Sequence, residues 1–470
     1  MTTPRPSIAS LGDLRRSGYA PRSVREEIRE NLLRRLRAGK PIFEGVLGYE
    51  DTVVPAVENA LLCGHDLIFL GERGQAKSRM IRQLASLLDE WLPVLPGCEI
   101  LEDPFAPLTS AGRERLEREG DRCEIAWAPR EERYVEKLAT PDVSIADLIG
   151  DVDPVKVAQG RSLADPATIH FGLIPRTHRG IFCINELPDL TEKVQVGLFN
   201  IMEERDVQVK GYRLRLPVDV FVVASANPED YTSRGRIITP LKDRYAAQIR
   251  THYPPTRDLE LAIVRQEATL PEVDGIRLHV PPFMEDLVAE ITFQARSSPD
   301  VNQASGVSVR MSIANYETLA ANAVRRALRA GESEAVPRIS DLDALQASTS
   351  GKLELEYAGS ERAEGDVVRD LVRRATKVVF DARCDVEELA GIAQAFEQGW
   401  RVEVSAAMPA PEVLTGLDEI PGLRHAAEKL AGSASAPRLA ASVEFLLEGL
   451  HLSNKLNKSV REGSARYGRA

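Results

Sequence analysis

The stretch from Leu70 to Met80, "LGERGQAKSRM", constrains the fold of this chain more than any other part of the sequence. It follows an apolar run, "LIF", and precedes a segment with helical periodicity, which is the setting of a phosphate-binding loop. Such a loop reads Gly, four residues, Gly, Lys, and then Ser or Thr. Here Gly71 begins the pattern, Ala76 stands where the second Gly belongs, and Lys77 and Ser78 complete it. Strand, loop and helix in this order predict an α/β domain with a parallel sheet.

The loop predicts nucleotide binding because its backbone N–H groups and the following helix terminus surround phosphates, while Lys77 adds positive charge and Ser78 coordinates Mg²⁺. If position 76 needs a left-handed backbone, Ala costs roughly 1–2 kcal/mol more than Gly; if it is helical, the methyl group only crowds the phosphates. Either cost is small beside the loss of Lys77. A chance match is the alternative, and the place of the motif between a strand and a helix argues against it. The predicted nucleotide-binding residues of the loop are Gly71, Glu72, Arg73, Gly74, Gln75, Ala76, Lys77, Ser78 and Arg79.

Composition excludes several other classes of function. A chain of 470 residues with 43% hydrophobic and 28% charged residues has room for two or three domains with apolar cores. The net charge of -11 does not favour nucleic acid or anionic membranes as partners. No apolar run approaches the roughly 20 residues of a membrane span, and the amino terminus lacks a signal-peptide core, so we expect a cytoplasmic protein. The five cysteines and seven histidines show no spacing typical of a metal site or a hydrolase triad.

Four segments are expected along the chain. Residues 1–40 are predicted to be a loose lead-in followed by an Arg-rich helix that begins at Ser23 with a capping box. Residues 41–255 alternate short apolar runs with helical segments, as expected for an α/β nucleotide-binding domain. Helical periodicity then dominates 256–350, a predicted helical lid, and 351–470, a predicted helical extension. The expected core strands are His65 to Leu70, Ile181 to Ile184 and Val218 to Ala224; the expected helices include Pro55 to Cys63, Lys77 to Leu88 and a segment opened by Thr191.

Two later stretches supply candidate catalytic residues. "GIFCINELPDL" ends a predicted strand with Asn185-Glu186, where Asp-Glu is usual. Glu186 can activate water as a general base, whereas Asn185 can contact a metal-bound water but brings no charge. The alternative is that these two residues simply end a buried strand. In "SANPED", Asn227 can orient the attacking water from the next strand, although Asn-Pro alone would indicate a turn.

The order of these motifs resembles an AAA+ ATPase. The phosphate-binding loop, "INE" at 184–186, "SANPED" at 225–230, "LKDRY" at 241–245 and "SVRMS" at 308–312 are most similar to the helix-2-insert group, which contains the magnesium chelatase I subunit and MoxR-type ATPases. "LGYED" at 47–51 resembles the segment that opens the domain in that group. The stretch from "EERD" to "SANPED" resembles its hairpin and sensor, with Lys210-Gly211 as the turn. The resemblance covers roughly residues 41–335.

The resemblance implies further roles. Arg244 in "LKDRY" matches the arginine finger that acts on ATP in a neighbouring subunit, and Arg310 in "SVRMS" matches the sensor 2 arginine of an all-α lid. Both could instead be surface residues, and Arg234 and Arg236 are rivals to Arg244. The family's insert fits Gly150 to Phe171, a predicted loop or hairpin. The departures at Ala76 and Asn185 put the rate of hydrolysis in doubt more than binding.

The predicted function is therefore an ATP-hydrolysing ring motor or remodelling chaperone that uses ATP and Mg²⁺, with the metal at Ser78, Asn185 and Glu186. The resemblance implies a homo-oligomeric, hexameric ring and a partner protein with a von Willebrand A domain. An enhancer-dependent transcription activator is one alternative, because "IADLIGD" and the motif order also resemble that branch, but the sequence lacks the Gly-Ala-Phe-Thr-Gly-Ala loop and a convincing recognition helix. A nucleotide-binding scaffold with little hydrolysis is the other.

Overall fold

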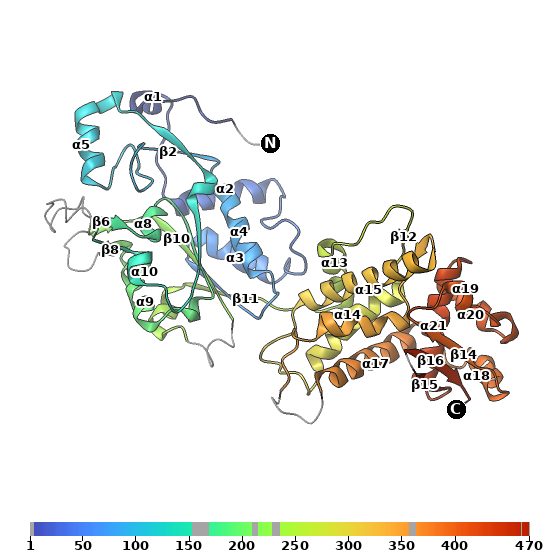
Figure 1. Ribbon diagram of the computed structural model, residues 1–470. Coiled ribbons are helices and arrows are strands. Elements are labelled where there is room, and N and C mark those ends of the chain that lie inside the picture. The colour runs from blue at the N-terminus through green and yellow to red at the C-terminus, as the bar shows by residue number, and fades with distance from the viewer. Residues whose placement is uncertain are drawn as a thin grey trace. The chain divides into compact units, whose positions relative to one another are not determined.

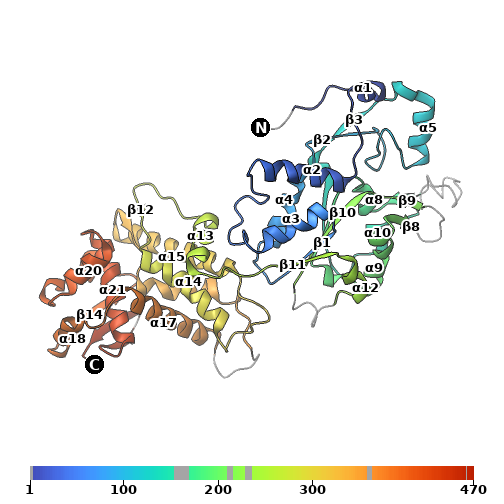
Figure 2. The same cartoon turned by 180° about the vertical axis from the view of Figure 1, so that it is seen from behind.

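The chain forms two compact units, Met1–His252 and Tyr253–Ala470, shown in Figure 1 and, from behind, in Figure 2. The computed structural model describes residues 4–152, 169–208, 215–227, 236–356, 363–461 and 463–469. The segment boundaries expected at residues 40 and 350 remain predictions.

The first unit is built on a five-stranded sheet in the order β11-β1-β10-β7-β4. All neighbouring strands in this sheet are parallel. The strands are β1 (Leu67–Leu70), β4 (Tyr134–Leu138), β7 (Gly180–Asn185), β10 (Val220–Ala226) and β11 (Ala247–Arg250). β1 lies inside the sheet. From β1 the chain passes to one edge of the sheet, where it forms β4, and then forms β7 and β10 in turn. It finally crosses β1 to form β11 at the other edge. In such open parallel sheets, ligands bind at the carboxyl ends of the strands near the reversal of strand order.

Alternating side chains of the sheet enter two separate apolar layers, as the two-residue period of a strand requires. On β1, Leu67 and Phe69 join one core with α2 (Val24–Arg37), α3 (Val53–Cys63) and α4 (Lys77–Leu84). Ile68 and Leu70 join the other core. That second core also contains residues of α6 (Ile145–Leu148), α8 (Leu173–Arg176), α9 (Glu192–Gly197), α10 (Phe199–Glu203) and α12 (Thr239–Arg244). The sheet is therefore covered by helices on both faces (Figures 1 and 2), which confirms the predicted α/β fold class.

The three predicted core strands correspond to β1, β7 and β10, with β10 shifted two residues later than expected. The sequence analysis did not predict β4 and β11. Both are edge strands of the sheet, and only one residue of "AQIR" and none of "YVEKL" is fully buried. An edge strand does not need a continuous apolar run, so this pattern gives no strong signal.

The helix signals were largely confirmed. Ser23 and Glu26 form the expected capping box of α2, and Gly64 ends α3 in the left-handed conformation. The segment after Lys77 is α4 followed by a short 3-10 turn, Ala85–Leu87. The helix expected after Thr191 is divided at Leu198 into α9 and α10.

The expectation of a loose lead-in before residue 22 was wrong. Ser10 caps α1 (Leu11–Arg16), whose Leu11 and Leu14 are buried. They pack against Leu95 and Cys123, near an antiparallel pair, β2 (Trp91–Val94) and β3 (Ala126–Pro129), that is joined through α5 (Ser110–Glu119). The prolines of the segment favoured a loop prediction, but a short helix with two buried leucines completes this small core.

Two further antiparallel pairs extend from the first unit. β5 (Gly150–Val152) pairs with β6 (Ile169–Phe171), so the ends of the predicted insert form a hairpin stem. β8 (Asp206–Gln208) pairs with β9 (Arg215–Pro217), as the predicted hairpin requires. The interior of the insert, the Lys210-Gly211 turn, Arg234 and residues 228–230 of "SANPED" lie outside the described residues.

The second unit is largely helical, as predicted. Its larger apolar core includes residues from Val264 to Tyr467, and a smaller one contains Ala323, Val324, Ala327 and Ala335. Its longer helices are α13 (Arg257–Glu267), α14 (Pro282–Ser297), α15 (Val309–Ala330), α17 (Glu364–Arg383), α18 (Ala390–Glu397), α20 (Leu423–Ala431) and α21 (Ala436–Leu452). The short strands of this unit were not predicted. A two-stranded parallel pair, β12 (Arg277–Leu278) with β13 (Glu334–Ala335), and a three-stranded antiparallel sheet are also present. The sheet comprises β14 (Val402–Ser405), β15 (Asn457–Arg461) and β16 (Ser464–Gly468). Among the described residues, no helix is long and apolar enough to cross a membrane.

Candidate functional site

The loop after β1 has the backbone of a tight phosphate-binding turn. Gly74 has φ 76°, Ala76 has φ 56° and ψ 14°, and α4 begins directly afterwards at Lys77. Ala76 therefore occupies the left-handed region, which decides between the two alternatives left open by the sequence. The departure from Gly costs roughly 1–2 kcal/mol of backbone strain.

Lys77 is folded over this loop and is only 7% exposed. Its ammonium group donates hydrogen bonds to the carbonyl oxygens of Gly71 and, at 2.8 Å, Glu72. A buried ammonium group held against the loop backbone is placed to exchange these carbonyl partners for phosphate oxygens. Ser78, in the first turn of α4, is exposed.

Gln75 stabilises the loop from within. Its side-chain carbonyl accepts hydrogen bonds from the backbone N–H of Glu72 at 3.0 Å and from the Thr251 hydroxyl at 2.6 Å. A Cβ atom on Gly71 would lie 1.9 Å from the Thr251 hydroxyl oxygen and 2.3 Å from the Gln75 carbonyl oxygen. Only Gly therefore fits at the start of the loop without moving Gln75 and Thr251.

Tyr49, from "LGYED", contacts the loop from the other side. Its hydroxyl donates to the carbonyl oxygens of Gln75 at 3.0 Å and His252 at 2.8 Å. Burial raises the pKa of Tyr49 to about 12, so the hydroxyl keeps its proton at neutral pH. The segment that opens the domain is thereby connected to both the loop and the end of the unit.

Glu186 follows β7 at the same edge of the sheet. Its backbone is also left-handed, with φ 53° and ψ 49°, and its side chain is half-buried. The backbone N–H of Glu186 donates to the Ser225 hydroxyl at 3.2 Å. That hydroxyl donates in turn to the side-chain carbonyl of Asn185, also at 3.2 Å. Left-handed non-glycine residues that persist in spite of their strain often mark functional positions.

Asn227 lies at the end of β10, next to β7, and is 2% exposed. Its side-chain carbonyl oxygen is buried and has no hydrogen-bond partner among the described residues. A buried acceptor without a donor costs about 1–3 kcal/mol, so a water or ligand donor is expected there. This amide is suited to hold a water molecule against a bound phosphate.

Arg244 ends α12 and is held by its own chain. Its guanidinium group forms an ion pair with Glu203, donates to the carbonyl of Pro240 at 2.7 Å, and lies 4.6 Å from the ring centre of Phe199. The rival Arg236 is more loosely placed: its side chain is 74% exposed and lies 3.8 Å from Glu192. To contact a phosphate, Arg244 would have to leave Glu203.

The structure brings most of the predicted site residues to one edge of one sheet. The loop follows β1, Asn185 ends β7 and Glu186 comes directly after it, and Asn227 follows β10, which lies between β1 and β7. Arg310 belongs to the second unit, at the start of α15, where its backbone N–H donates to Ser308 and its side chain is exposed. It therefore remains a predicted site residue.

Sequence reasoning missed several polar residues that support the cluster. Thr251 follows β11, and Glu136 lies on β4, the two strands that were not predicted. Glu136 accepts two hydrogen bonds from Arg82 of α4, at 2.8 and 2.9 Å, and one from the side chain of Asn185. The only signal for Glu136 was a carboxylate in a short segment of β-branched and aromatic residues.

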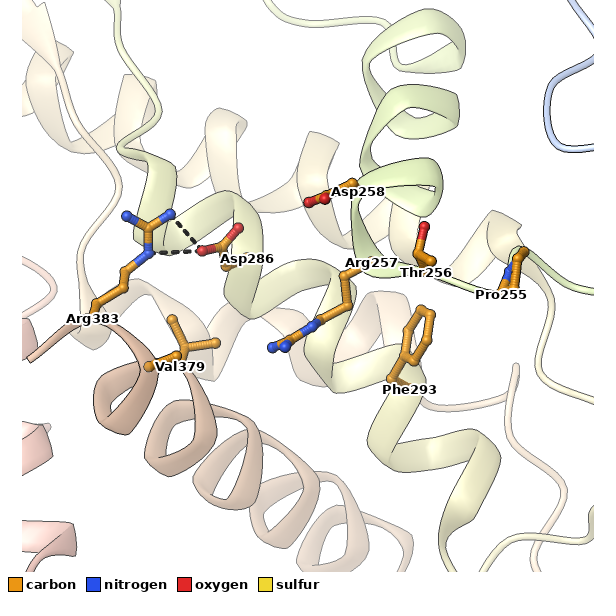
Figure 3. A pocket seen from close by; sticks show the side chains of 9 residues that line it. Pro255, Thr256, Arg257, Asp258, Asp286, Phe293, Val379 and Arg383 are labelled. Atoms are coloured by element: carbon orange, nitrogen blue, oxygen red, sulfur yellow. Dashed lines mark hydrogen bonds and ion pairs between the residues drawn. The ribbon is translucent and has the colours of Figure 1, made fainter.

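A groove of about 580 Å³ in the second unit offers no comparable chemistry. It lies at the start of α13, and Figure 3 shows Arg383 and Asp286 joined beside it. Arg383 contacts Asp286 at 2.7 Å, and Arg257 contacts Glu290 at 3.0 Å. Among the described residues, no group of three or more His, Cys, Asp or Glu side chains could hold a metal ion, and the five cysteines are free.

Comparison with known proteins gives a consistent result. The family model of the sigma-54 interaction domain matches residues 162–242, from the insert to α12. The magnesium-chelatase subunit ChlI of Nostoc sp. is 26% identical over 257 residues, which cover 53% of this chain and 63% of that protein. The 38 kDa magnesium-chelatase subunit of Acidiphilium rubrum is 28% identical over 237 residues, covering 48% and 62%. The chain thus spans about three fifths of the length of these curated relatives.

Similar solved structures include NtrX from Brucella abortus in complex with ATP, with a TM-score of 0.40 and 16% identity over 75% of this chain and 66% of that one. A complex of subunits BchI and BchD of magnesium chelatase gives a TM-score of 0.32 and 19% identity over 70% and 90%. Scores this low support no residue-by-residue correspondence.

Proposed function

We propose that this chain, an AAA+ protein distantly related to the magnesium-chelatase I subunit and to sigma-54 interaction domains, binds and hydrolyses ATP. The energy would be used to remodel a partner protein. One observation carries the proposal: the Lys77 loop, Glu186 and Asn227 meet at adjacent strand ends, and the buried side-chain oxygen of Asn227 has no partner among the described residues. Each is suited to a different part of phosphoryl transfer to water.

In this mechanism the loop N–H groups and Lys77 bind the β- and γ-phosphates. Asn227 accepts a hydrogen bond from the attacking water. Glu186 takes a proton from that water. At the same time the water oxygen forms a bond to the γ-phosphorus, and the bond between the γ-phosphorus and the ADP oxygen breaks. Arg244 of a neighbouring copy contributes positive charge to the transferred group. Arg310 is proposed to contact nucleotide from the lid.

Mg²⁺ would be held by the Ser78 hydroxyl, with Asn185 and Glu186 contacting its water shell, and when bound would neutralise charge on the phosphate oxygens. The donors fit this role because Ser78 is exposed in the first turn after the loop and Glu186 is only half-buried. The charge of Asn185 is zero, so a weaker metal site than with Asp is expected.

We further propose that the chain acts as a homo-oligomeric ring, as the family resemblance implies for a finger that works between subunits. A hexamer, a von Willebrand A domain partner and a cytoplasmic location belong to this proposal.

The test is steady-state phosphate release from Mg-ATP at several protein concentrations, with ATP binding measured in parallel. Wild type is expected to show turnover per chain that rises with protein concentration. Lys77→Ala should lose binding and turnover, whereas Glu186→Gln should keep binding and lose turnover. ATP binding without turnover in wild type, with or without a candidate partner, would support the nucleotide-binding scaffold instead.

A second candidate function, an activator of sigma-54-dependent transcription, is supported by the family match at residues 162–242. Against it, no Gly-Ala-Phe-Thr-Gly-Ala sequence occurs in the chain. Nucleotide-dependent binding to purified sigma-54 would favour this function, and its absence with a hydrolysing wild type would favour the remodelling role.

A further inference from the structure

Three adjacent strands place a continuous set of polar side chains beneath α4. Glu136 on β4, Asn185 on β7 and Ser225 on β10 lie on the face of the sheet that carries Cys183, since Glu136 is in register with Cys183 and Asn185 and Ser225 follow the same alternation. The side chain of Asn185 is 8% exposed and touches both neighbours.

The hydrogen bonds determine which way the Asn185 amide points. Its carbonyl oxygen faces two donors, the Ser225 hydroxyl at 3.2 Å and the Cys183 thiol at 3.5 Å. Burial raises the pKa of Cys183 to about 12, so the thiol retains the proton that it donates. The amide NH₂ faces the Glu136 carboxylate, which also accepts two hydrogen bonds from Arg82.

The residue at position 185 therefore needs both a donor and an acceptor. An Asp at this position would keep the contacts to Ser225 and Cys183 but would turn a second carboxylate oxygen toward Glu136. Two carboxylates at hydrogen-bond distance cannot both ionise without strong repulsion. Arg82 and the Tyr134 hydroxyl, at 3.1 Å, are the other charged or titratable groups that contact Glu136.

We propose that Glu136 is a positioning residue for hydrolysis: it orients the Asn185 amide, which through Ser225 holds the backbone of Glu186 in its left-handed conformation. Asn185 and Glu136 are a matched pair, in which the carboxylate expected on β7 lies on β4 instead. This inference rests on the proposed ATPase function, and it explains why Asn185 departs from the usual motif.

The test is a double-mutant cycle of wild type, Asn185→Asp, Glu136→Gln and Asn185→Asp/Glu136→Gln. Asn185→Asp is expected to lower the unfolding midpoint at pH 8, because it places a second carboxylate at hydrogen-bond distance from Glu136. The double variant restores a donor opposite an acceptor, so its unfolding midpoint should exceed that of Asn185→Asp at pH 8. Additive effects of the two changes at pH 8 would overturn the pairing.

Turnover tests the positioning role. Glu136→Ala, which removes the acceptor of the Asn185 amide, and Asn185→Asp should each reduce kcat at least about tenfold, with little change in ATP affinity. The double variant should regain turnover relative to Asn185→Asp and bind Mg-ATP more tightly than wild type, since it carries a carboxylate at the usual position. Glu131→Ala, at an exposed glutamate just before β4, is the matched control and should change neither quantity.

The two proposals fail in different ways. A wild type that neither binds nor hydrolyses ATP would remove the function, while the stability cycle would still report on the pair. A coupled stability cycle with unchanged kcat in Glu136→Ala would show a structural pair only and would overturn the positioning role.

Discussion

Two non-glycine residues at the nucleotide edge share the same uncommon backbone, and their surroundings differ. Ala76, in the loop after β1, has φ 56°, and Glu186, after β7, has φ 53°. The backbone of Glu186 is held by Ser225, and through Ser225 by Asn185. Ala76 has no side-chain polar group, and only its neighbours Gln75 and Lys77 are anchored by side-chain hydrogen bonds.

The difference teaches that strain alone does not identify a catalytic position. At Glu186 the strain accompanies a carboxylate that the left-handed backbone presents at the sheet edge, and a network of polar side chains supports it. At Ala76, a Gly would adopt the same backbone conformation without the methyl group, so the structure shows no function for the strain. Replacement by Gly is therefore expected to relieve strain at both positions but to reduce turnover strongly only at Glu186.

The largest expected effect is at Arg244, which is proposed to complete the catalytic site of Glu186 from a neighbouring copy. Arg244→Ala should lower kcat by about 10³-fold, because an arginine finger contributes roughly that much to phosphoryl transfer. Phosphate release by equal mixtures of Arg244→Ala and Glu186→Gln measures whether the site is shared, since mixed rings would contain intact sites and regain turnover.

Arg236→Ala is the control for this experiment, because Arg236 lies on the same stretch but is mostly exposed. A loss of turnover in Arg236→Ala and not in Arg244→Ala would reverse the assignment.

Glu203→Gln should raise turnover at low protein concentration, because it releases Arg244 from its ion pair.

Much of this edge could be predicted from the sequence because its signals are local. The loop, β7 with Asn185-Glu186, and β10 with Asn227 each combine an apolar run with a polar end inside a few residues. The edge strands β4 and β11 could not be predicted in this way, and Glu136 and Thr251 were missed with them. The pairing of Glu136 with Asn185 depends on strand register across 49 residues of chain. Neither the left-handed backbone of Ala76 nor the Glu203 contact of Arg244 has a local signal.

The next prediction separates backbone from side chain at Glu186. Glu186→Gly should relieve strain of roughly 1–2 kcal/mol but remove the general base, so kcat should fall by at least about 10²-fold while the free energy of unfolding does not decrease. Urea unfolding and phosphate release measure the two effects. Glu186→Gln is the matched control, since it loses turnover and keeps the strained backbone; equal turnover in wild type and Glu186→Gly would exclude Glu186 as the base.

The smallest expected effect is at Ala76. Ala76→Gly removes strain of roughly 1–2 kcal/mol, and the greater flexibility of Gly in the unfolded chain offsets about 0.5–1 kcal/mol of this gain. The free energy of unfolding should therefore rise by about 0.5–1 kcal/mol, measured by urea unfolding. Ala85→Gly is the matched control, because Ala85 has φ -54° and gains no relief, so the same substitution should destabilise the protein there. A destabilised Ala76→Gly would mean that the methyl group packs favourably enough to outweigh its strain, and the two left-handed residues would then be alike in having local support.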